Sequence, residues 1–263
     1  MPSSMVPTLG SVTTSARMNI RTGAPSTTAP VVGKVPAGTV LTVRGVVHGD
    51  DVLGNADWYA GIDDTFFWSG ATYGFEPQTT SGAGGPLAVH RRPNGTIRPL
   101  SDAEIRSVFG NVTHTEKPRG RVELDPAWVA ANIVEADTPL LASVGYPKLS
   151  LHRKAAQAFL RVLDAIAAAG LTDRLITCDG TFVPRHKGWD PNRTLSSHTW
   201  GIAIDLNAQW NGYGTEPAVL GAHGSVRELV ALFEAEGFAW GGYFEPETVR
   251  DGMHFELARL SQT

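Results

Sequence analysis

The chain has 263 residues, of which 42% are hydrophobic and 18% are charged. This balance predicts a globular protein of one or two domains and excludes a largely disordered chain. The net charge of −4 offers no basic surface for nucleic acid, and no apolar run is long enough to cross a bilayer.

The N-terminus and the single cysteine bear on where the protein acts. The opening residues MPSSMVPTLG contain neither the basic nor the apolar segment of a signal peptide. We therefore expect secretion or release by a route that the chain does not encode. Cys178 follows the apolar run RLIT and can form no intramolecular disulfide, so it is predicted to be a small buried hydrophobic residue.

The first part of the sequence predicts a small all-β domain. Residues 1–14 are expected to form a tail, and residues 15–75 contain short alternating or β-branched runs, such as MNIRT, VVGKV and TVLTVRGVV, separated by turns. Strands at this spacing predict a small barrel or sandwich. The aromatic residues near its end are predicted to be mainly core, with a ligand groove as the alternative: Trp58, Tyr59, Phe66, Phe67 and Trp68.

This segment also resembles a known module. MNIRTGAPSTTAPVVGKVPAGTVLTV and DWYAG are similar to a bacterial SH3-like domain, a type of module that binds cell walls and often accompanies peptidoglycan enzymes. The resemblance implies a small barrel that anchors the protein to the bacterial wall. The closing TFFWSGATYGF departs from the usual Gly-Trp-Val type of ending, which leaves the ligand groove open. Residues 76–86, rich in Gly, Ser, Thr and Pro, are predicted to be a linker.

The remaining residues, 87–263, predict an α+β domain with a small antiparallel sheet packed on helices. Capping residues, apolar spacing and terminal glycines predict helices within residues 101–110, 125–134, 150–171 and 225–237. The segments RLITC, WGIAIDLN and MHFEL are predicted to be strands. Because helices and strands do not alternate in regular βαβ units, an α+β arrangement is favoured over a parallel sheet.

Two of the predicted strands bring titratable residues to one face. In GIAID the alternation places Asp205 opposite to the isoleucines, and Gly201 allows a bend that lets His198 face the same point. In DGMHFEL the alternation places His254 and Glu256 on one face. These residues are either ordinary polar positions beside strands or groups that converge on one charged ligand.

Convergence would produce a metal site. Two imidazoles and one carboxylate form a three-ligand zinc site with an open position, which activates water and polarises a carbonyl. Asp251 is available as the general base. Arg185 is the best upstream candidate to stabilise the oxyanion, with Arg193 and Lys187 as alternatives in the same loop. The HExxH signature of helix-borne zinc sites is absent from the sequence.

The motifs resemble those of the M15 family of zinc peptidases, which includes D-alanyl-D-alanine carboxypeptidases and L-alanyl-D-glutamate endopeptidases. SSHTWGIAID fills every fixed position of the family's Ser-x-His-x-x-Gly-x-Ala-x-Asp motif, and DGMHFE matches its second motif. GFAWGGYF and GTFVPRHKG resemble further family segments. The resemblance implies zinc bound by His198, Asp205 and His254, with Asp251 as the catalytic base and Arg185 near the scissile carbonyl.

Other residues near these motifs have two interpretations. Ser196 and Trp240 are predicted to bind substrate; the alternatives are that Ser196 braces the loop of His198 and that Trp240 caps the core. Glu256 is predicted to be a partner of a ligand rather than a ligand. Five histidines are predicted to be surface or structural residues, because none has a partner at ligand spacing: His48, His90, His114, His186 and His223. His152 falls beside the apolar stripe of the predicted helix and is also predicted to be a structural or surface residue.

The resemblances together imply a zinc-dependent hydrolase of peptidoglycan stem peptides, most consistent with an L-alanyl-D-glutamate endopeptidase of the phage endolysin or bacterial autolysin type. A wall-binding module suits a polymeric substrate. The alternatives are a D-alanyl-D-alanine carboxypeptidase with the same site and a non-catalytic, zinc-containing wall-binding protein. We expect a monomer that acts at the cell wall, with the stem peptide and the wall as partners.

Overall fold

The computed structural model describes residues 6–61, 63–77, 89–92, 96–244 and 248–259. The chain divides into two compact units, one of residues 1–82 with 219–231 and the other of residues 83–218 with 232–263. Most of the predicted linker, residues 78–86, lies outside the described residues. None of the described helices is long and apolar enough to span a membrane.

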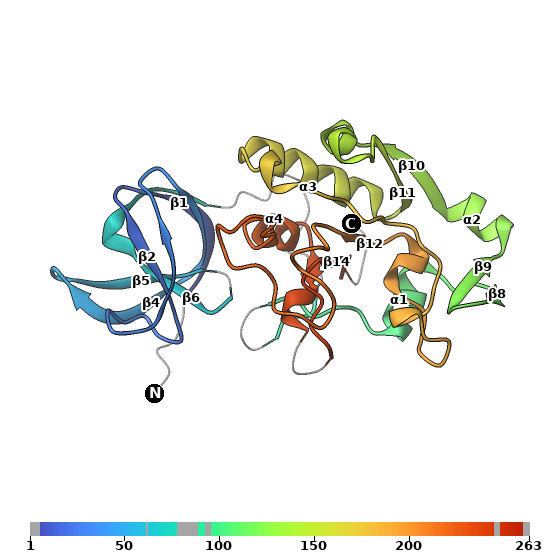
Figure 1. The fold of residues 1–263 in the computed structure, drawn as a ribbon, viewed down its shortest axis with the longest axis horizontal. Helices are drawn as coiled ribbons and strands as arrows, with labels where there is room; N and C mark the ends of the chain where they lie inside the picture. The colour runs from blue at the N-terminus through green and yellow to red at the C-terminus, as the bar shows by residue number, and fades with distance from the viewer. Residues whose placement is uncertain (1–5, 62, 78–88, 93–95, 245–247, 260–263) are drawn as a thin grey trace. The chain divides into compact units, whose positions relative to one another are not determined.

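The first unit is built on a seven-stranded antiparallel sheet with the order β3-β2-β6-β5-β4-β1-β7 (Figure 1). Its strands are β1 (Val6–Thr14), β2 (Met18–Thr22), β3 (Val31–Val35), β4 (Val40–Val52), β5 (Asn55–Ala60), β6 (Thr65–Trp68) and β7 (Thr72–Pro77). Two apolar clusters pack on this sheet. One contains Val12, Met18, Ile20, Leu41, Val43 and Phe67, and the other contains Val47, Trp58 and Ala60.

One expectation for this unit needs correction, and another is not confirmed. Residues 6–14, expected to belong to a tail, form β1, which pairs with both β4 and β7 because the ladder offers hydrogen-bond partners on each side. Strands β3 and β7 stand at the two edges, and no pairing joins them within the described residues. The strands therefore form an open, curved sheet, and a closed SH3-like barrel is not shown. Trp58 and Phe67 are core residues, as predicted, each 2% exposed.

The rest of the chain combines short strands with four α-helices among the described residues (Figure 1). The helices are α1 (Asp102–Phe109), α2 (Pro126–Asn132), α3 (Ala156–Ala168) and α4 (Val230–Ala235). The strands are β8 (His114–Lys117), β9 (Arg121–Leu124), β10 (Ile133–Asp137), β11 (Lys148–His152), β12 (Ala203–Asp205), β13 (Phe238–Trp240) and β14 (His254–Leu257). They form the hairpins β8–β9 and β10–β11 and the three-stranded sheet β12-β14-β13.

Local sequence signals explain some helix ends and fail at others. The capping box of Ser101 and Glu104 opens α1 as predicted. The helix expected in 150–171 begins only at Ala156, because the preceding residues pair with β10 and bury Leu149 and Leu151. The hydroxyl of Ser225 does donate to the Glu228 carboxylate, at 2.7 Å, yet α4 begins later.

The three-stranded sheet is clamped by aromatic side chains from two helices. Phe159 of α3 meets Phe238 of β13 edge to face at 4.7 Å between ring centroids. Phe233 of α4 stacks on Phe255 of β14 at 4.1 Å. The predicted strand RLITC is wrong: residues 174–178 contribute only an isolated bridge between Cys178 and Leu206. Cys178 itself is buried and free, as expected.

Candidate metal centre

The pairing of β12 with β14 sets out the polar face predicted from the alternation. The strands are antiparallel, and Asp205 lies directly opposite His254 while Ala203 lies opposite Glu256. Side chains of directly opposed residues share one face of a sheet. Asp205, His254 and Glu256 therefore project from the same side, away from the clamped face that carries Phe255.

His198 reaches the same place from a tight turn. It lies in the 3₁₀ turn Ser197–Trp200, which ends at Gly201 with φ of 66°, in the left-handed region. A Cβ atom at Gly201 would lie 2.9 Å from the backbone nitrogen of His152. Glycine is thus required both by the backbone conformation and by this close approach. The turn directs the His198 ring onto the face of the sheet that carries Asp205.

The three side chains converge on one point. The Nε2 atom of His198 lies 3.1 Å from Oδ1 of Asp205 and 3.1 Å from Nδ1 of His254, and the latter two atoms are 2.9 Å apart. Four ligands placed tetrahedrally about zinc at its usual bond lengths are about 3.3 Å apart. The three side chains are 1–9% exposed. The spacing therefore fits a buried zinc site with small adjustments.

The outer nitrogen of each histidine is already engaged, which fixes the atom that faces the centre. Nδ1 of His198 donates to the carbonyl oxygen of Thr181 at 2.9 Å, and Nε2 of His254 donates to the carboxylate of Glu256 at 3.0 Å. With a metal bound, the inner nitrogens would each present a lone pair to the ion. Metal-bound histidines show this pattern of an outer N–H held by a carbonyl or a carboxylate. Glu256 has the partner role predicted from the sequence.

The electrostatics of the group favour a positive charge at its centre. Burial opposes charge on His254, but its hydrogen bonds with Asp205 and Glu256 raise the pKa of His254 to about 10. Burial also opposes charge on Asp205, yet the two histidines hold the pKa of that carboxyl well below its usual range. A cation that replaces the proton would meet the same two buried carboxylates.

Asp251 lies beside this group and differs from the other carboxylates. Its Oδ1 atom is buried and has no hydrogen-bond partner among the described residues. Burial is the main cause that raises the pKa of Asp251, and the charge of Asp205 adds to it, while that of His254 opposes it. Its backbone nitrogen donates to the carbonyl oxygen of Gly241 at 3.0 Å. An unengaged carboxylate oxygen with a raised pKa suits a general base that later acts as an acid.

The structure separates the three candidate cations of the upstream loop. Arg185 is half-buried, and burial lowers its pKa, while the negative charges of Asp205 and Asp251 act in the opposite direction. Lys187 donates to Asp102 at 2.8 Å, and Arg193 donates to the hydroxyl of Tyr213 at 3.2 Å. Arg185 is therefore the candidate whose charge acts on both Asp205 and Asp251, whereas the charge of Lys187 acts on Glu256.

Ser196 and Trp240 hold the site rather than face it in this conformation. The hydroxyl of Ser196 accepts the backbone N–H of His198 at 3.4 Å, at the start of the turn. The ring of Trp240 is 1% exposed and donates to the carbonyl oxygen of Gly252 at 2.7 Å. These contacts favour the bracing and core alternatives, and a substrate-binding role for either residue stays a prediction.

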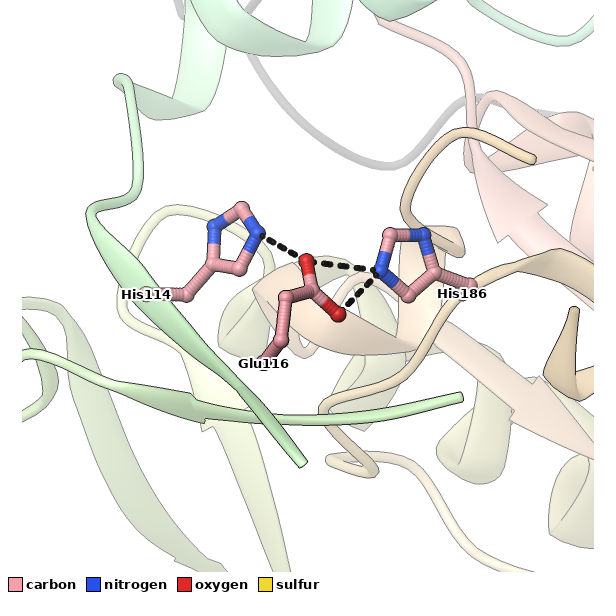
Figure 2. Close-up of side chains that lie close together, drawn as sticks. All are labelled: His114, Glu116 and His186. Atoms are coloured by element: carbon pink, nitrogen blue, oxygen red, sulfur yellow. Dashed lines mark hydrogen bonds and ion pairs between the residues drawn. The ribbon is translucent and has the colours of Figure 1, made fainter. Parts of the chain in front are cut away.

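A second group of donors escaped the sequence analysis. His114 and His186, expected to lack a partner at ligand spacing, both lie beside Glu116 (Figure 2). That expectation was wrong. The sequence feature that could have revealed this group is the spacing of His114 and Glu116, which places both on one face of a strand. No pattern near that strand indicates that His186 would join them. Of the other histidines, His48 lies at the surface, where its side chain is 75% exposed. His90 lies 3.0 Å from a carboxylate oxygen of Glu104, and His152 is buried.

Comparison with known families supports a peptidase. Residues 190–257 match the model of an M15 peptidase family described as D-alanyl-D-alanine carboxypeptidase. The matched segment contains all three donors of the buried group and Asp251, whereas Arg185 lies upstream of it. No curated protein matches the chain significantly. The match covers less than half of the chain, so it supports peptidase chemistry for the segment that carries the site.

Proposed function

We propose that this protein is a zinc-dependent peptidoglycan hydrolase that cleaves a peptide bond of the stem peptide. The observation that carries the proposal is the buried group of His198, Asp205 and His254, whose inner donor atoms lie within 3.1 Å of one another. The outer nitrogens of both histidines are held by Thr181 and Glu256, so each donor is oriented in advance. The match to the M15 peptidase family supports the same chemistry.

The roles of the chain's own residues follow from their positions. Zinc held by the three donors would supply a Lewis acid that polarises the scissile carbonyl and acidifies water. Asp251 takes the proton of the attacking water on its unengaged Oδ1 atom and passes it to the leaving amine. Arg185, whose positive charge interacts with Asp205 and Asp251, stabilises the negative charge that develops on the carbonyl oxygen.

We further propose that the bond cleaved is the L-alanyl-D-glutamate bond and that the protein acts at the cell wall. The resemblance of residues 15–75 to an SH3-like wall-binding module supports this choice, because an anchored enzyme suits a polymeric substrate. A second candidate is a D-alanyl-D-alanine carboxypeptidase, the activity by which the matching family is described. Both activities would use the same donors and the same base.

Digestion of purified peptidoglycan, followed by mass spectrometry of the fragments, tests the proposal. The endopeptidase produces fragments with a new amino-terminal D-glutamate, and the carboxypeptidase produces stem peptides shortened by one D-alanine. Either product should disappear when a chelator removes zinc and return when zinc is added back. If no bond is cleaved at any zinc concentration, the proposal is wrong and a non-catalytic wall-binding protein becomes the better interpretation.

A further inference from the structure

The second group of donor residues shares no member with the buried centre. It contains His114, Glu116 and His186, whose donor atoms all lie within 4.8 Å of one another. Nε2 of His114 is 3.1 Å from Oε1 of Glu116, and Nε2 of His186 is 3.1 and 3.0 Å from the two carboxylate oxygens. Figure 2 shows both rings turned toward the carboxylate that lies between them.

The hairpin directs two of these donors inward. In the β8–β9 hairpin, His114 lies opposite Leu124 and Glu116 lies opposite Val122. Directly opposed residues share a face, and both apolar partners are 6% exposed, so this is the face turned toward the body of the unit. The Glu116 side chain remains 58% exposed, which leaves solvent access to the group.

The hydrogen bonds of His186 leave its Nε2 atom facing Glu116 with no proton of its own in a neutral ring. Its Nδ1 atom lies 2.5 Å from the carbonyl oxygen of Arg193, which only accepts hydrogen bonds, so Nδ1 carries a proton. In the neutral ring, Nε2 is then a bare lone pair that faces two carboxylate oxygens. Either a second proton or a metal cation must lie there. His198 of the buried centre has the same arrangement, with Nδ1 held by a carbonyl oxygen and Nε2 turned inward.

We propose that His114, Glu116 and His186 form a second site for a divalent transition-metal ion of the zinc class. One such ion satisfies all three donors at once, whereas without it the Nε2 atoms of both rings must each carry a proton to hydrogen-bond the single carboxylate. Two imidazoles and a carboxylate suit zinc and its neighbours rather than calcium or magnesium, which prefer oxygen ligands. The exposed side of Glu116 leaves room for water to complete the coordination.

The position of this site gives the ion a bracing role. The backbone of Arg121 in β9 forms a bridge with that of Arg185, and His186 N–H donates to the carbonyl oxygen of Gly120 at 2.8 Å. A metal bound by His114, Glu116 and His186 would add a side-chain cross-link to these backbone contacts. It would link the hairpin to the segment that carries Arg185. The ion would thus help to position Arg185 and would not itself contact substrate.

Counting metal ions per chain tests the proposal. The full chain is stripped, equilibrated with zinc at a buffered micromolar concentration, and analysed by elemental mass spectrometry. We expect the Glu116→Gln chain to hold one ion fewer than the unmodified chain. Glu123→Gln is the matched control, because Glu123 lies on the same hairpin and pairs with Lys117 instead. An equal count in the unmodified and Glu116→Gln chains overturns the proposal, as does an equal loss in the Glu123→Gln chain.

Two further measurements guard against misfolding and against confusion with the buried centre. His114→Gln, at a partly exposed strand position, should show the same loss of one ion, with a circular dichroism spectrum like that of the unmodified chain. The Glu116→Gln effect should also persist in an Asp205→Asn background, where the buried centre is impaired. If the difference of one ion disappears in that background, the effect belongs to the buried centre and the second site is ruled out.

Discussion

At the scale of single residues, Asp251 combines a buried, unengaged oxygen with a position beside the buried group of His198, Asp205 and His254. Asp251→Asn keeps the shape of the side chain and removes its ability to accept a proton. We expect turnover to fall by about 10²–10⁴-fold, the usual contribution of general acid–base catalysis. Zinc content should stay unchanged, because Asp251 is not among the donors. Rates of fragment release and metal analysis of the same sample measure both effects.

Asp137→Asn is the control for this substitution. The Asp137 side chain is 83% exposed and pairs with Lys148 at the surface, so turnover should stay within experimental error of the unmodified chain. Full activity of the Asp251→Asn chain would remove Asp251 from the mechanism. Loss of zinc from that chain would instead mean that Asp251 belongs to the donor set.

The raised pKa of His254 predicts how zinc binding depends on pH. Burial opposes its charge, but Asp205 and Glu256 raise its pKa to about 10, so at neutral pH the metal-free ring carries a proton that zinc must displace. Affinity should therefore rise by about tenfold per pH unit from neutral pH toward pH 10 and then level off. Calorimetry in buffers of different ionisation enthalpy should detect about one proton released per ion at this site. A pH-independent affinity between pH 7 and 9 would contradict this protonation state.

At the scale of elements, the turn after β13 supports the catalytic base. A Cβ atom at Gly241 would lie 2.2 Å from the carbonyl oxygen of Asp251, a distance that no packing tolerates. Gly241→Ala should therefore push the Asp251 segment away from the donors. We expect a loss of about 1–3 kcal/mol in the free energy of unfolding, as for other overpacked sites, together with a large drop in turnover. Chemical denaturation and fragment release measure the two effects.

Gly212→Ala provides the comparison for this variant. A Cβ atom there would lie no closer than 3.5 Å to a neighbouring atom, which is an ordinary contact, and the backbone conformation is open to alanine. Stability and turnover should change little. If both alanine variants behave alike, the close approach of Gly241 to Asp251 does not position the base.

The same elements show what sequence patterns can predict. The alternation in GIAID and HFEL predicts the polar face of each strand, because successive side chains of a strand point to opposite faces. The register of β12 on β14 then brings Asp205 and His254 together. Patterns misled where pairing partners decide the structure: residues 150–152 are predicted to begin a helix but belong to β11, which pairs with β10. The group around Glu116 could not be predicted, since His186 is brought to the hairpin by backbone bridges that no local pattern records.

At the scale of the whole molecule, the donors and the anchoring module we propose lie in separate compact units. We expect the full chain to bind purified cell walls equally well with and without a chelator, while cleavage stops without zinc. Co-sedimentation with walls and fragment analysis of the same samples measure both properties. The Asp251→Asn chain, with zinc bound, is the control for binding without turnover. Release from the walls by the chelator would place binding at the metal centre instead.

The register of β12 on β14 has a consequence for how the chain acquires its native state. Asp205 meets His254 only in the observed pairing, since a slip of one residue would turn every side chain of β14 to the opposite face. Competing pairings formed during refolding would lack the complete donor set and gain nothing from zinc. Zinc should then stabilise the native strand pairing relative to other collapsed species. The ion would thus guide folding in addition to the catalytic role that we propose.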